Sequence, residues 1–181
     1  MDLFDYMREN ALRQEAPLAV RMRPRKLEEI VGQTHILGEG KLLYRAVRAD
    51  AVGSMILYGP PGSGKTTIAE VISRETKSEF CRLNATTAGK KEMEEVIQEA
   101  RENFGRGKRT TLFVDEIHRF HKGQQDFLLP YVEDGTIALI GATTENPFFE
   151  VNAALLSRSR IFELKPLAAA DIAALLRRAM E

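Results

Sequence analysis

The stretch Gly59–Thr66 has the residue types and spacing of a phosphate-binding loop. Its sequence, GPPGSGKT, matches the pattern G-x-x-x-x-G-K-[ST], with an apolar run before it and a helical pattern after it. Glycines let such a loop curl so that successive N–H groups point at phosphate oxygens, and the following helix adds the positive end of its dipole. Because strand, loop and helix signals occur together, a chance match in a Gly/Pro turn is the weaker interpretation.

This loop predicts ATP and Mg²⁺ as the bound cofactors. The side chain of Lys65 is expected to contact the β- and γ-phosphates, and the hydroxyl of Thr66 to ligate Mg²⁺. The residues predicted to bind the nucleotide here are Pro60, Pro61, Gly62, Ser63, Gly64, Lys65, Thr66 and Thr67.

Two adjacent acids, Asp115 and Glu116, follow the apolar run at 111–114. A buried strand delivers side chains at its carboxyl end, where open α/β sheets bind their ligands. Asp115 is predicted to hold Mg²⁺, directly or through water, and Glu116 to act as the general base on the attacking water. An apolar run that ends in two acids is by itself usually a strand followed by a solvated turn. Its position about one βαβ unit after the phosphate loop favours hydrolysis.

Apolar runs alternate with helical patterns from Ser54 onward. Strands are predicted over 55–58, 80–83, 111–114, 137–142 and 161–164, and helices over 27–30, 40–50, 65–76, 90–103, 124–132 and 153–157. Strands that are apolar throughout and separated by helices are typical of a parallel sheet covered on both faces. We therefore predict an α/β fold of the P-loop NTPase class, a three-layer sandwich with a five-stranded parallel sheet spanning 17–166.

Segments at both ends fall outside this core. Residues 1–16 are predicted to form an N-terminal helical extension, and residues 167–181 to begin a new helix. The apolar face of that last helix has nothing obvious to bury it, and its members are Ile172, Leu175, Leu176 and Ala179. We expect the chain to be a fragment that ends where a second, helical domain starts.

The composition is that of a soluble globular protein. The chain has 181 residues, 44% of them hydrophobic and 29% charged, with 26 basic and 26 acidic side chains. A net charge of zero gives no overall attraction to nucleic acid, so a DNA contact requires a local basic patch. The single cysteine, Cys81, excludes an intrachain disulfide and a cysteine-based zinc site. With no signal peptide and no membrane-length apolar run, a cytoplasmic location is expected.

Several stretches together resemble AAA+ ATPases of the clamp-loader group. The phosphate loop and Asp115–His118 carry the general likeness. Residues 17–24, 31–33, 141–147 and 154–160 are similar to the replication-associated recombination protein A family, the bacterial relatives of the eukaryotic Werner helicase-interacting protein. The likeness covers nearly the whole chain, and the Ala-Thr-Thr-Glu-Asn-Pro stretch at 142–147 is its most specific part. It implies that residues 167–181 begin a helical lid.

The resemblance also implies roles near the nucleotide. Val31 and Gly32, with Pro24, resemble the segment that packs on adenine. Asn84 resembles the residue that holds the catalytic glutamate until a partner is engaged.

Two further roles follow from the resemblance. Thr144 resembles the sensor that orients water and the γ-phosphate, with Asn146 as the alternative because the spacing is ambiguous. Arg158 resembles the arginine finger that reaches a neighbouring subunit's site; without the resemblance it would be interpreted as a solvated surface arginine.

The implied function is ATP hydrolysis by an oligomer that acts on DNA at stalled or damaged replication forks. DNA junctions or ends, further copies of the chain and single-stranded DNA-binding protein are the implied partners. The family's second sensor arginine and oligomerisation domain have no counterpart in these residues, so weak turnover is expected. The alternatives are a clamp-loader or branch-migration subunit, and a nucleotide-gated binding module in which hydrolysis is incidental.

Three other features are interpreted as structural. His118 and His121 have a spacing that could clip a metal, but no third ligand is apparent, so both are expected to be polar residues on a loop or helix start. The basic cluster at 106–109 is interpreted as a solvated turn, with DNA contact as the alternative. Cys81 is expected to be a small core side chain rather than a nucleophile.

Overall fold

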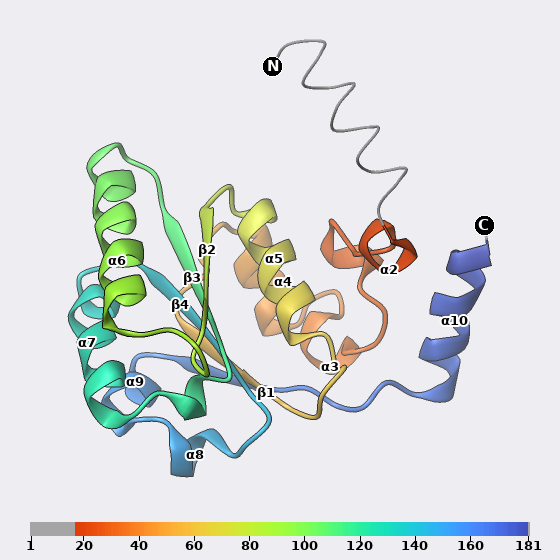
Figure 1. Cartoon of the computed structure of the whole chain (residues 1–181). Coiled ribbons are helices and arrows are strands. Elements are labelled where there is room, and N and C mark those ends of the chain that lie inside the picture. The colour runs from red at the N-terminus through yellow and green to blue at the C-terminus, as the bar shows by residue number, and fades with distance from the viewer. Residues whose placement is uncertain (1–16, 181) are drawn as a thin grey trace.

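The computed structural model describes residues 17–180, so the helical extension predicted over 1–16 lies outside the described residues. A five-stranded, all-parallel sheet forms the centre of the molecule (Figure 1). Its strands in spatial order are β2 (Glu79–Asn84), β3 (Thr110–Asp115), β4 (Ala138–Thr143), β1 (Met55–Tyr58) and β5 (Arg160–Glu163). The five predicted strands are confirmed: β1 has the predicted bounds, and the ends of the other four differ by one residue.

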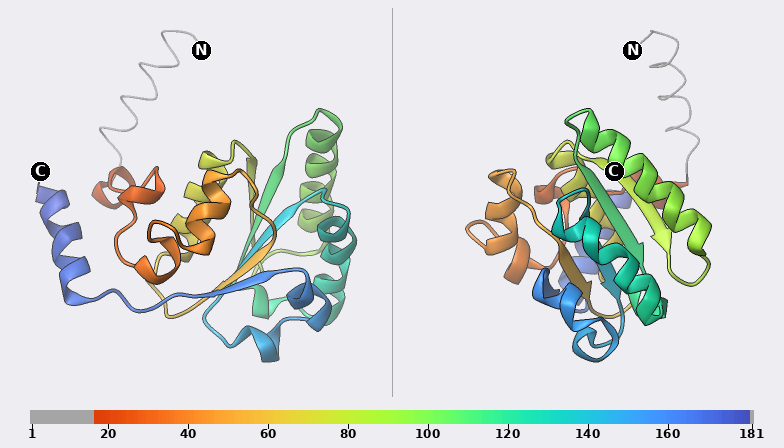
Figure 2. Two further views of the ribbon diagram at one scale, coloured as in Figure 1. Left: turned by 180° about the vertical axis from the view of Figure 1, so that it is seen from behind. Right: turned by 90° about the vertical axis from the view of Figure 1, so that its left-hand side faces the viewer.

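Helices cover both faces of this sheet, as the two turned views show (Figure 2). The longer covering helices are α4 (Leu42–Arg48), α5 (Lys65–Glu75), α6 (Lys90–Gly105) and α7 (Lys122–Glu133), and a further helix, α10 (Ala169–Met180), follows the last strand. The shorter ones are α2 (Leu18–Arg21), η1 (Leu27–Glu29), α3 (Thr34–Leu37), η2 (Ile117–Arg119), α8 (Pro147–Glu150) and α9 (Ala153–Ser157). None of the helices in the described residues is long and apolar enough to cross a membrane.

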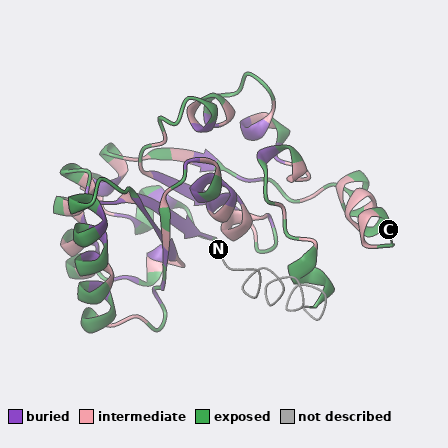
Figure 3. Ribbon diagram, turned by 90° about the horizontal axis from the view of Figure 1, so that it is seen from above, coloured by how far each residue is buried: buried purple, intermediate pink, exposed green. Residues whose placement is uncertain are grey.

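Two apolar clusters fill the space on either side of the sheet. One packs α3, α4 and α5 against strand residues such as Leu57 and Phe113, and the other packs α6, α7 and α9 against residues such as Ile56 and Val114. Because neighbouring strand residues point to opposite faces, each central strand supplies both clusters. The buried residues gather along the sheet, and the exposed ones along the outer helix surfaces (Figure 3). The predicted three-layer α/β sandwich is confirmed.

Four short helices were not predicted, namely α2, α3, η2 and α8. Helix α8 begins at Pro147 and is capped by Asn146, whose Oδ1 accepts a hydrogen bond of 3.0 Å from the backbone N–H of Phe148. Helix α3 follows Gln33, which has a left-handed backbone conformation with φ 58°. A single helical turn is too short to show the 3.6-residue periodicity by which longer helices are found in a sequence.

Helix α10 lies away from the sheet at the end of an extended segment (Figure 1). None of its residues is buried, and Ile172, Leu176 and Met180 are exposed. Its contacts with the rest of the chain include a hydrogen bond of 2.8 Å from Arg178 to the carbonyl oxygen of Glu29. The predicted helix is therefore present, with its apolar face largely uncovered.

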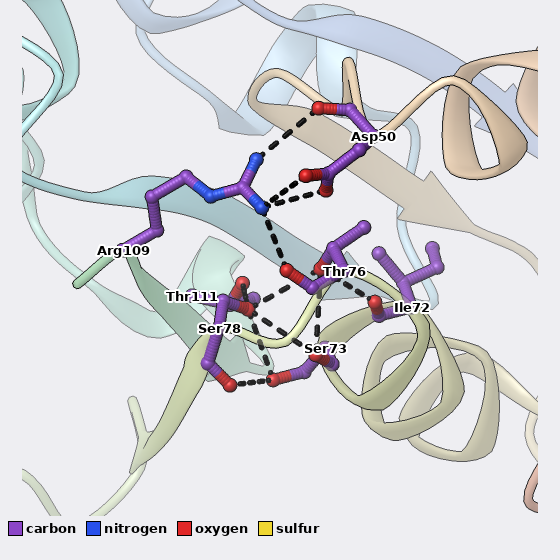
Figure 4. Close-up of polar contacts among 7 residues, drawn as sticks. All are labelled: Asp50, Ile72, Ser73, Thr76, Ser78, Arg109 and Thr111. Carbon is purple, nitrogen blue, oxygen red and sulfur yellow. Dashed lines mark hydrogen bonds and ion pairs between the residues drawn. The ribbon is translucent and has the colours of Figure 1, made fainter.

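The basic cluster at 106–109 is partly occupied by structural contacts. The guanidinium of Arg109 donates to both carboxylate oxygens of Asp50, each at 2.6 Å, and to the carbonyl oxygen of Thr76 at 2.7 Å (Figure 4). Nearby, the hydroxyls of Ser78 and Thr111 lie 2.6 Å apart. Lys108 pairs with Glu79 at 2.9 Å. This cluster ties the ends of α4 and α5 to the start of β3, opposite the carboxyl end of the strands.

Candidate functional site

A cavity of about 390 Å³ lies at the carboxyl end of the sheet. The phosphate loop enters it from the end of β1, the two acids from the end of β3, and one threonine from the end of β4. Since β4 lies between β3 and β1, parallel pairing alone brings the three segments together. The residues that line the cavity are Pro61, Gly62, Gly64, Lys65, Thr66, Thr67, Asp115, Glu116 and Thr144.

The loop has the backbone shape that its glycines predict. Gly64 has φ 99° and directly precedes α5, so a side chain there would be strained. This conformation lets the chain turn from the loop into the helix and directs the N-terminus of α5 toward the cavity.

The ammonium group of Lys65 lies against the loop itself. Its Nζ donates to the carbonyl oxygens of Gly59 at 2.8 Å and Pro60 at 2.9 Å. Burial lowers the pKa of Lys65 from its ordinary value, while the nearby carboxylates of Glu116 and Asp115 oppose that shift. Lys65 is thus a cation held at the cavity wall, between the loop and two acids.

The two acids have different partners. A carboxylate oxygen of Asp115 accepts a hydrogen bond of 3.2 Å from Arg82 on β2. Glu116 has a left-handed backbone with φ 56° and ψ 42°, which is costly for a residue with a side chain. Its carboxylate lies 3.2 Å from Nε2 of His118.

The two candidate sensor residues follow β4 and have different surroundings. Thr144 lines the cavity, whereas Asn146 caps α8. Thr143, the last residue of β4, is fully buried, and its hydroxyl lies 2.8 Å from Nδ1 of His118.

The segment at 31–33 lies beside the phosphate loop. The side-chain amide of Gln33 donates to the carbonyl oxygen of Ser63 at 3.1 Å. A Cβ atom on Gly32 would come within 2.7 Å of Leu167, just before α10. Val31 and Gly32 are partly buried there, but neither they nor Pro24 line the cavity.

Asn84 and Arg158 also lie outside the cavity wall. The side-chain oxygen of Asn84 accepts from the backbone N–H and the hydroxyl of Thr86, at 2.9 Å and 2.7 Å. Arg158 follows α9, forms an ion pair with Glu133 and donates to the carbonyl oxygen of Ala154 at 2.9 Å. Pro60 and Ser63 do not line the cavity either, although both accept hydrogen bonds from loop or neighbouring side chains.

Sequence analysis missed three residues that contact the site. Gln33 bridges the loop to residue 165, His118 contacts Glu116, and Arg82 contacts Asp115. For Arg82 a signal was present, because it is two residues before Asn84 and so shares its face of β2. For Gln33 the contacts depend on chain segments that are distant in sequence. For His118 the contact with Glu116 is local, but it follows a left-handed backbone at Glu116 that no sequence pattern indicated. His121 is confirmed as a helix-start residue, since its Nδ1 accepts from the N–H of Gln124 at 3.3 Å at the start of α7.

The residues of the wall suit Mg²⁺ together with a nucleotide. Mg²⁺ prefers oxygen ligands and is usually bound by one or two carboxylates plus substrate phosphates. Thr66 and Asp115 bring a hydroxyl and a carboxylate to the same cavity. Within residues 17–180 no group of three or more His, Cys, Asp or Glu side chains could hold a metal alone. The wall therefore fits an ion that is completed by its substrate.

Fold and site together define a P-loop nucleotide-binding protein. Residues 55–167 match the family described as "ATPase family associated with various cellular activities (AAA)", and the chain belongs to that family.

Similar proteins narrow the assignment. Replication-associated recombination protein A is 57% identical over 165 residues in Escherichia coli K12, covering 91% of this chain and 37% of that protein. The Bacillus subtilis protein of the same name is 52% identical over 91% of this chain and 38% of its own length. ATPase WRNIP1 of Dictyostelium discoideum is 45% identical over 92% of this chain and 19% of its own length. The resemblance inferred from the sequence is confirmed, and the chain spans less than two fifths of these relatives.

A solved structure shows the same architecture. A mutant of Thermotoga maritima RuvB superimposes with a TM-score of 0.71 at 27% identity, covering 87% of this chain and 54% of that one. Another RuvB structure, described as a Holliday junction branch migration motor, has a TM-score of 0.67 at 28% identity. The alignment covers 87% of this chain and 53% of that one.

Proposed function

We propose that this chain binds ATP with Mg²⁺ in the cavity at the carboxyl end of the sheet and hydrolyses it. The observation that carries the proposal is that Lys65, Asp115 and Glu116, from two motifs on non-adjacent strands, line one wall. A cation, a metal-binding carboxylate and a general base are what phosphoryl transfer to water requires.

Different groups of the loop bind different parts of the nucleotide and its metal ion. Backbone N–H groups of Gly62–Gly64 and the N-terminus of α5 attract the phosphates, and Lys65 leaves the loop carbonyls to contact the β- and γ-phosphates. Thr66 and Asp115 hold Mg²⁺, which neutralises charge on the phosphate oxygens when bound. Pro61 and Thr67 also line the cavity.

Glu116 accepts the proton of the attacking water. Glu116 lines the cavity, and its strained backbone keeps the side chain at the end of β3. Thr144, which shares the wall, orients the water and the γ-phosphate; the capping role of Asn146 favours Thr144 over it. Asn84 sits on the strand next to Asp115 and acts as the residue that restrains Glu116 after release from Thr86.

Further roles fall to residues outside the cavity wall. Val31, Gly32 and the nearby Pro24 bind adenine, supported by the contact between Gln33 and the loop. Arg158 serves a neighbouring copy of the chain, which agrees with its position outside the cavity of its own chain. A cation supplied from a neighbour raises phosphoryl-transfer rates by about 10³- to 10⁵-fold in other ATPases and GTPases. Residues 167–181 begin the lid that closes over the nucleotide.

The whole protein is proposed to act on DNA at stalled or damaged replication forks in the cytoplasm. The names of the bacterial relatives refer to replication-associated recombination, and they carry this part of the proposal. Junctions or ends of DNA are the proposed partners, with single-stranded DNA-binding protein as a further one. A branch-migration subunit is the second candidate, favoured by the structural likeness to RuvB.

The test measures Mg·ATP binding and turnover with Lys65→Ala and Glu116→Gln. Lys65→Ala is expected to abolish binding, and Glu116→Gln to keep binding while turnover falls by about 10²- to 10⁴-fold. Lys91→Ala and Glu95→Gln, an exposed pair on α6, are matched controls that should change neither quantity. No binding at millimolar ATP, or turnover unaffected by Glu116→Gln, would sink the proposal. Stimulation by forked DNA but not by four-way junctions would favour the fork over branch migration.

A further inference from the structure

His118 is buried between two residues of the site. Its side chain is 8% exposed and lies between the carboxylate of Glu116, 3.2 Å from Nε2, and the hydroxyl of Thr143, 2.8 Å from Nδ1. A buried imidazole with a partner on each nitrogen has a fixed ring orientation, because turning the ring would leave polar atoms without partners.

The hydrogen-bond directions form one consistent chain. The backbone N–H of Glu145 donates to the hydroxyl of Thr143 at 3.0 Å. Nε2 of His118 lies 3.2 Å from the carboxylate of Glu116, and because an ionised carboxylate can only accept, a hydrogen shared in this contact belongs to His118. In a neutral imidazole Nδ1 then accepts, and the Thr143 hydroxyl supplies that hydrogen. The same hydroxyl also lies 3.5 Å from the carbonyl oxygen of Glu145, a longer contact than the one of 2.8 Å to His118.

The packing around Gly141 explains how His118 reaches this place. A Cβ atom on Gly141 would come within 2.9 Å of Cδ1 of Ile117. Because Gly141 has no side chain, η2 can lie directly on β4, where Gly141 and Thr143 point to the same face. The residue after Ile117 is thereby brought to the hydroxyl of Thr143.

We propose that His118 is a positioning residue that orients Glu116 for attack by water and couples it to the end of β4. This inference rests on the proposed hydrolysis of ATP. The coupling matters because Thr144 lines the same cavity and lies in sequence between Thr143 and Glu145, whose hydrogen bond belongs to this series. The general base and the residue facing the γ-phosphate therefore share one anchor, and a shift of either changes the position of the other.

The test separates orientation of the base from binding and folding. In His118→Ala, kcat is expected to fall by about 10- to 100-fold, the loss typical when an outer hydrogen-bond partner of a reacting group is removed, with the ATP dissociation constant unchanged within about twofold. His118→Gln, whose amide can still donate to Glu116, should recover part of kcat. Thr143→Val should lower kcat in the same direction, and Thr143→Ser, which keeps the hydroxyl, should not.

His121→Ala is the matched control, since His121 contacts Gln124 at the start of α7 and not the site. The midpoint of thermal unfolding is measured for every variant. A parallel loss of kcat, nucleotide affinity and unfolding temperature in His118→Ala, without recovery in His118→Gln, would show a merely structural role and overturn the inference.

Two outcomes distinguish this inference from the proposed function. If Glu116→Gln is inactive while His118→Ala keeps the unmodified kcat, ATP hydrolysis stands and the role of His118 fails. If Glu116→Gln turns over ATP like the unmodified protein, the proposed function fails first. A measurement without turnover is the ¹⁵N NMR spectrum of the imidazoles, assigned by loss of the His118 signals in His118→Gln. We expect Nε2 of His118 to carry the proton; a proton on Nδ1 alone would overturn the inference.

Discussion

Gln33 and Lys165, 132 residues apart in the sequence, exchange two hydrogen bonds. The side-chain amide of Gln33 donates to the carbonyl oxygen of Lys165 at 2.7 Å, and the backbone N–H of Lys165 donates to Oε1 of Gln33 at 2.9 Å. The same amide also donates to Ser63 in the phosphate loop. One buried side chain thus joins the segment before α3, the phosphate loop and the segment that leads to α10.

Replacing Gln33 should loosen all three segments. Gln33→Ala removes the amide, and the backbone groups of Ser63 and Lys165 lose their hydrogen bonds to it. We therefore expect the free energy of unfolding to fall by about 1–3 kcal/mol. The ATP dissociation constant should rise as the loop loses its support. Urea unfolding and a nucleotide titration would measure both effects.

A second variant separates the lost amide from the backbone effect. Gln33 has φ 58°, a conformation that glycine adopts without strain. Gln33→Gly should therefore be less destabilising than Gln33→Ala, while both weaken nucleotide binding alike. Equal affinity of all three proteins for ATP would show that the bridge does not support the loop.

Thr144 and Asn146 should respond differently to substitution. Thr144 lines the cavity, so Thr144→Val is expected to lower kcat by about 10- to 100-fold with little change in stability. Asn146 caps α8, so Asn146→Ala should lower the free energy of unfolding by about 1 kcal/mol and leave kcat nearly unchanged. Steady-state turnover and thermal unfolding distinguish the two. The opposite pattern would assign the sensor role to Asn146.

The Arg109 cluster should affect stability without affecting the nucleotide. Lysine cannot contact both Asp50 and the carbonyl of Thr76 with the planar fork of arginine, so Arg109→Lys is expected to cost about 1 kcal/mol, a modest loss because the ion pair is half exposed. Arg106→Ala, in the neighbouring exposed turn, is the control. A change in ATP affinity in Arg109→Lys would contradict the separation of this end of the sheet from the site.

Cys81 should be unreactive while the chain is folded. Burial, together with nearby Glu99, raises the pKa of the Cys81 thiol from 9.0 to about 11. At pH 8 the thiolate fraction is then about 10⁻³, so alkylation by iodoacetamide should be slow until denaturant is added. Fast alkylation of the native chain at pH 8 would contradict this burial.

The same shift predicts a pH dependence of stability. Because the folded-state pKa is the higher one, the unfolded chain releases this proton first. Its contribution to stability is complete below about pH 9 and is lost as the pH rises toward about 11. Cys81→Val should show a smaller loss of unfolding free energy across that interval, as measured by denaturant titration at each pH.

The sequence by itself determined the sheet, the phosphate loop and the paired acids. Apolar strand runs and the G-x-x-x-x-G-K-[ST] pattern are local signals, and parallel pairing then places Lys65, Asp115 and Glu116 at one edge. The roles of Asn84, Arg158 and the segment at 31–32 came from resemblance alone and stay predictions.

Only the tertiary structure decided which side chains support these groups. In the sequence, His118 is interpreted as a loop histidine and Gln33 as part of a short motif. In the structure, each contacts a segment that is distant in the sequence. Their partners depend on which strands are neighbours, on a missing side chain at Gly141 and on backbone atoms, which every residue has. A hydrogen bond to a backbone atom leaves no mark on the identity of the residue that supplies it, so no sequence pattern could have predicted the contacts of Gln33. The partners of His118 are side chains, and the approach of Thr143 depends on the packing of η2 on β4 at Gly141.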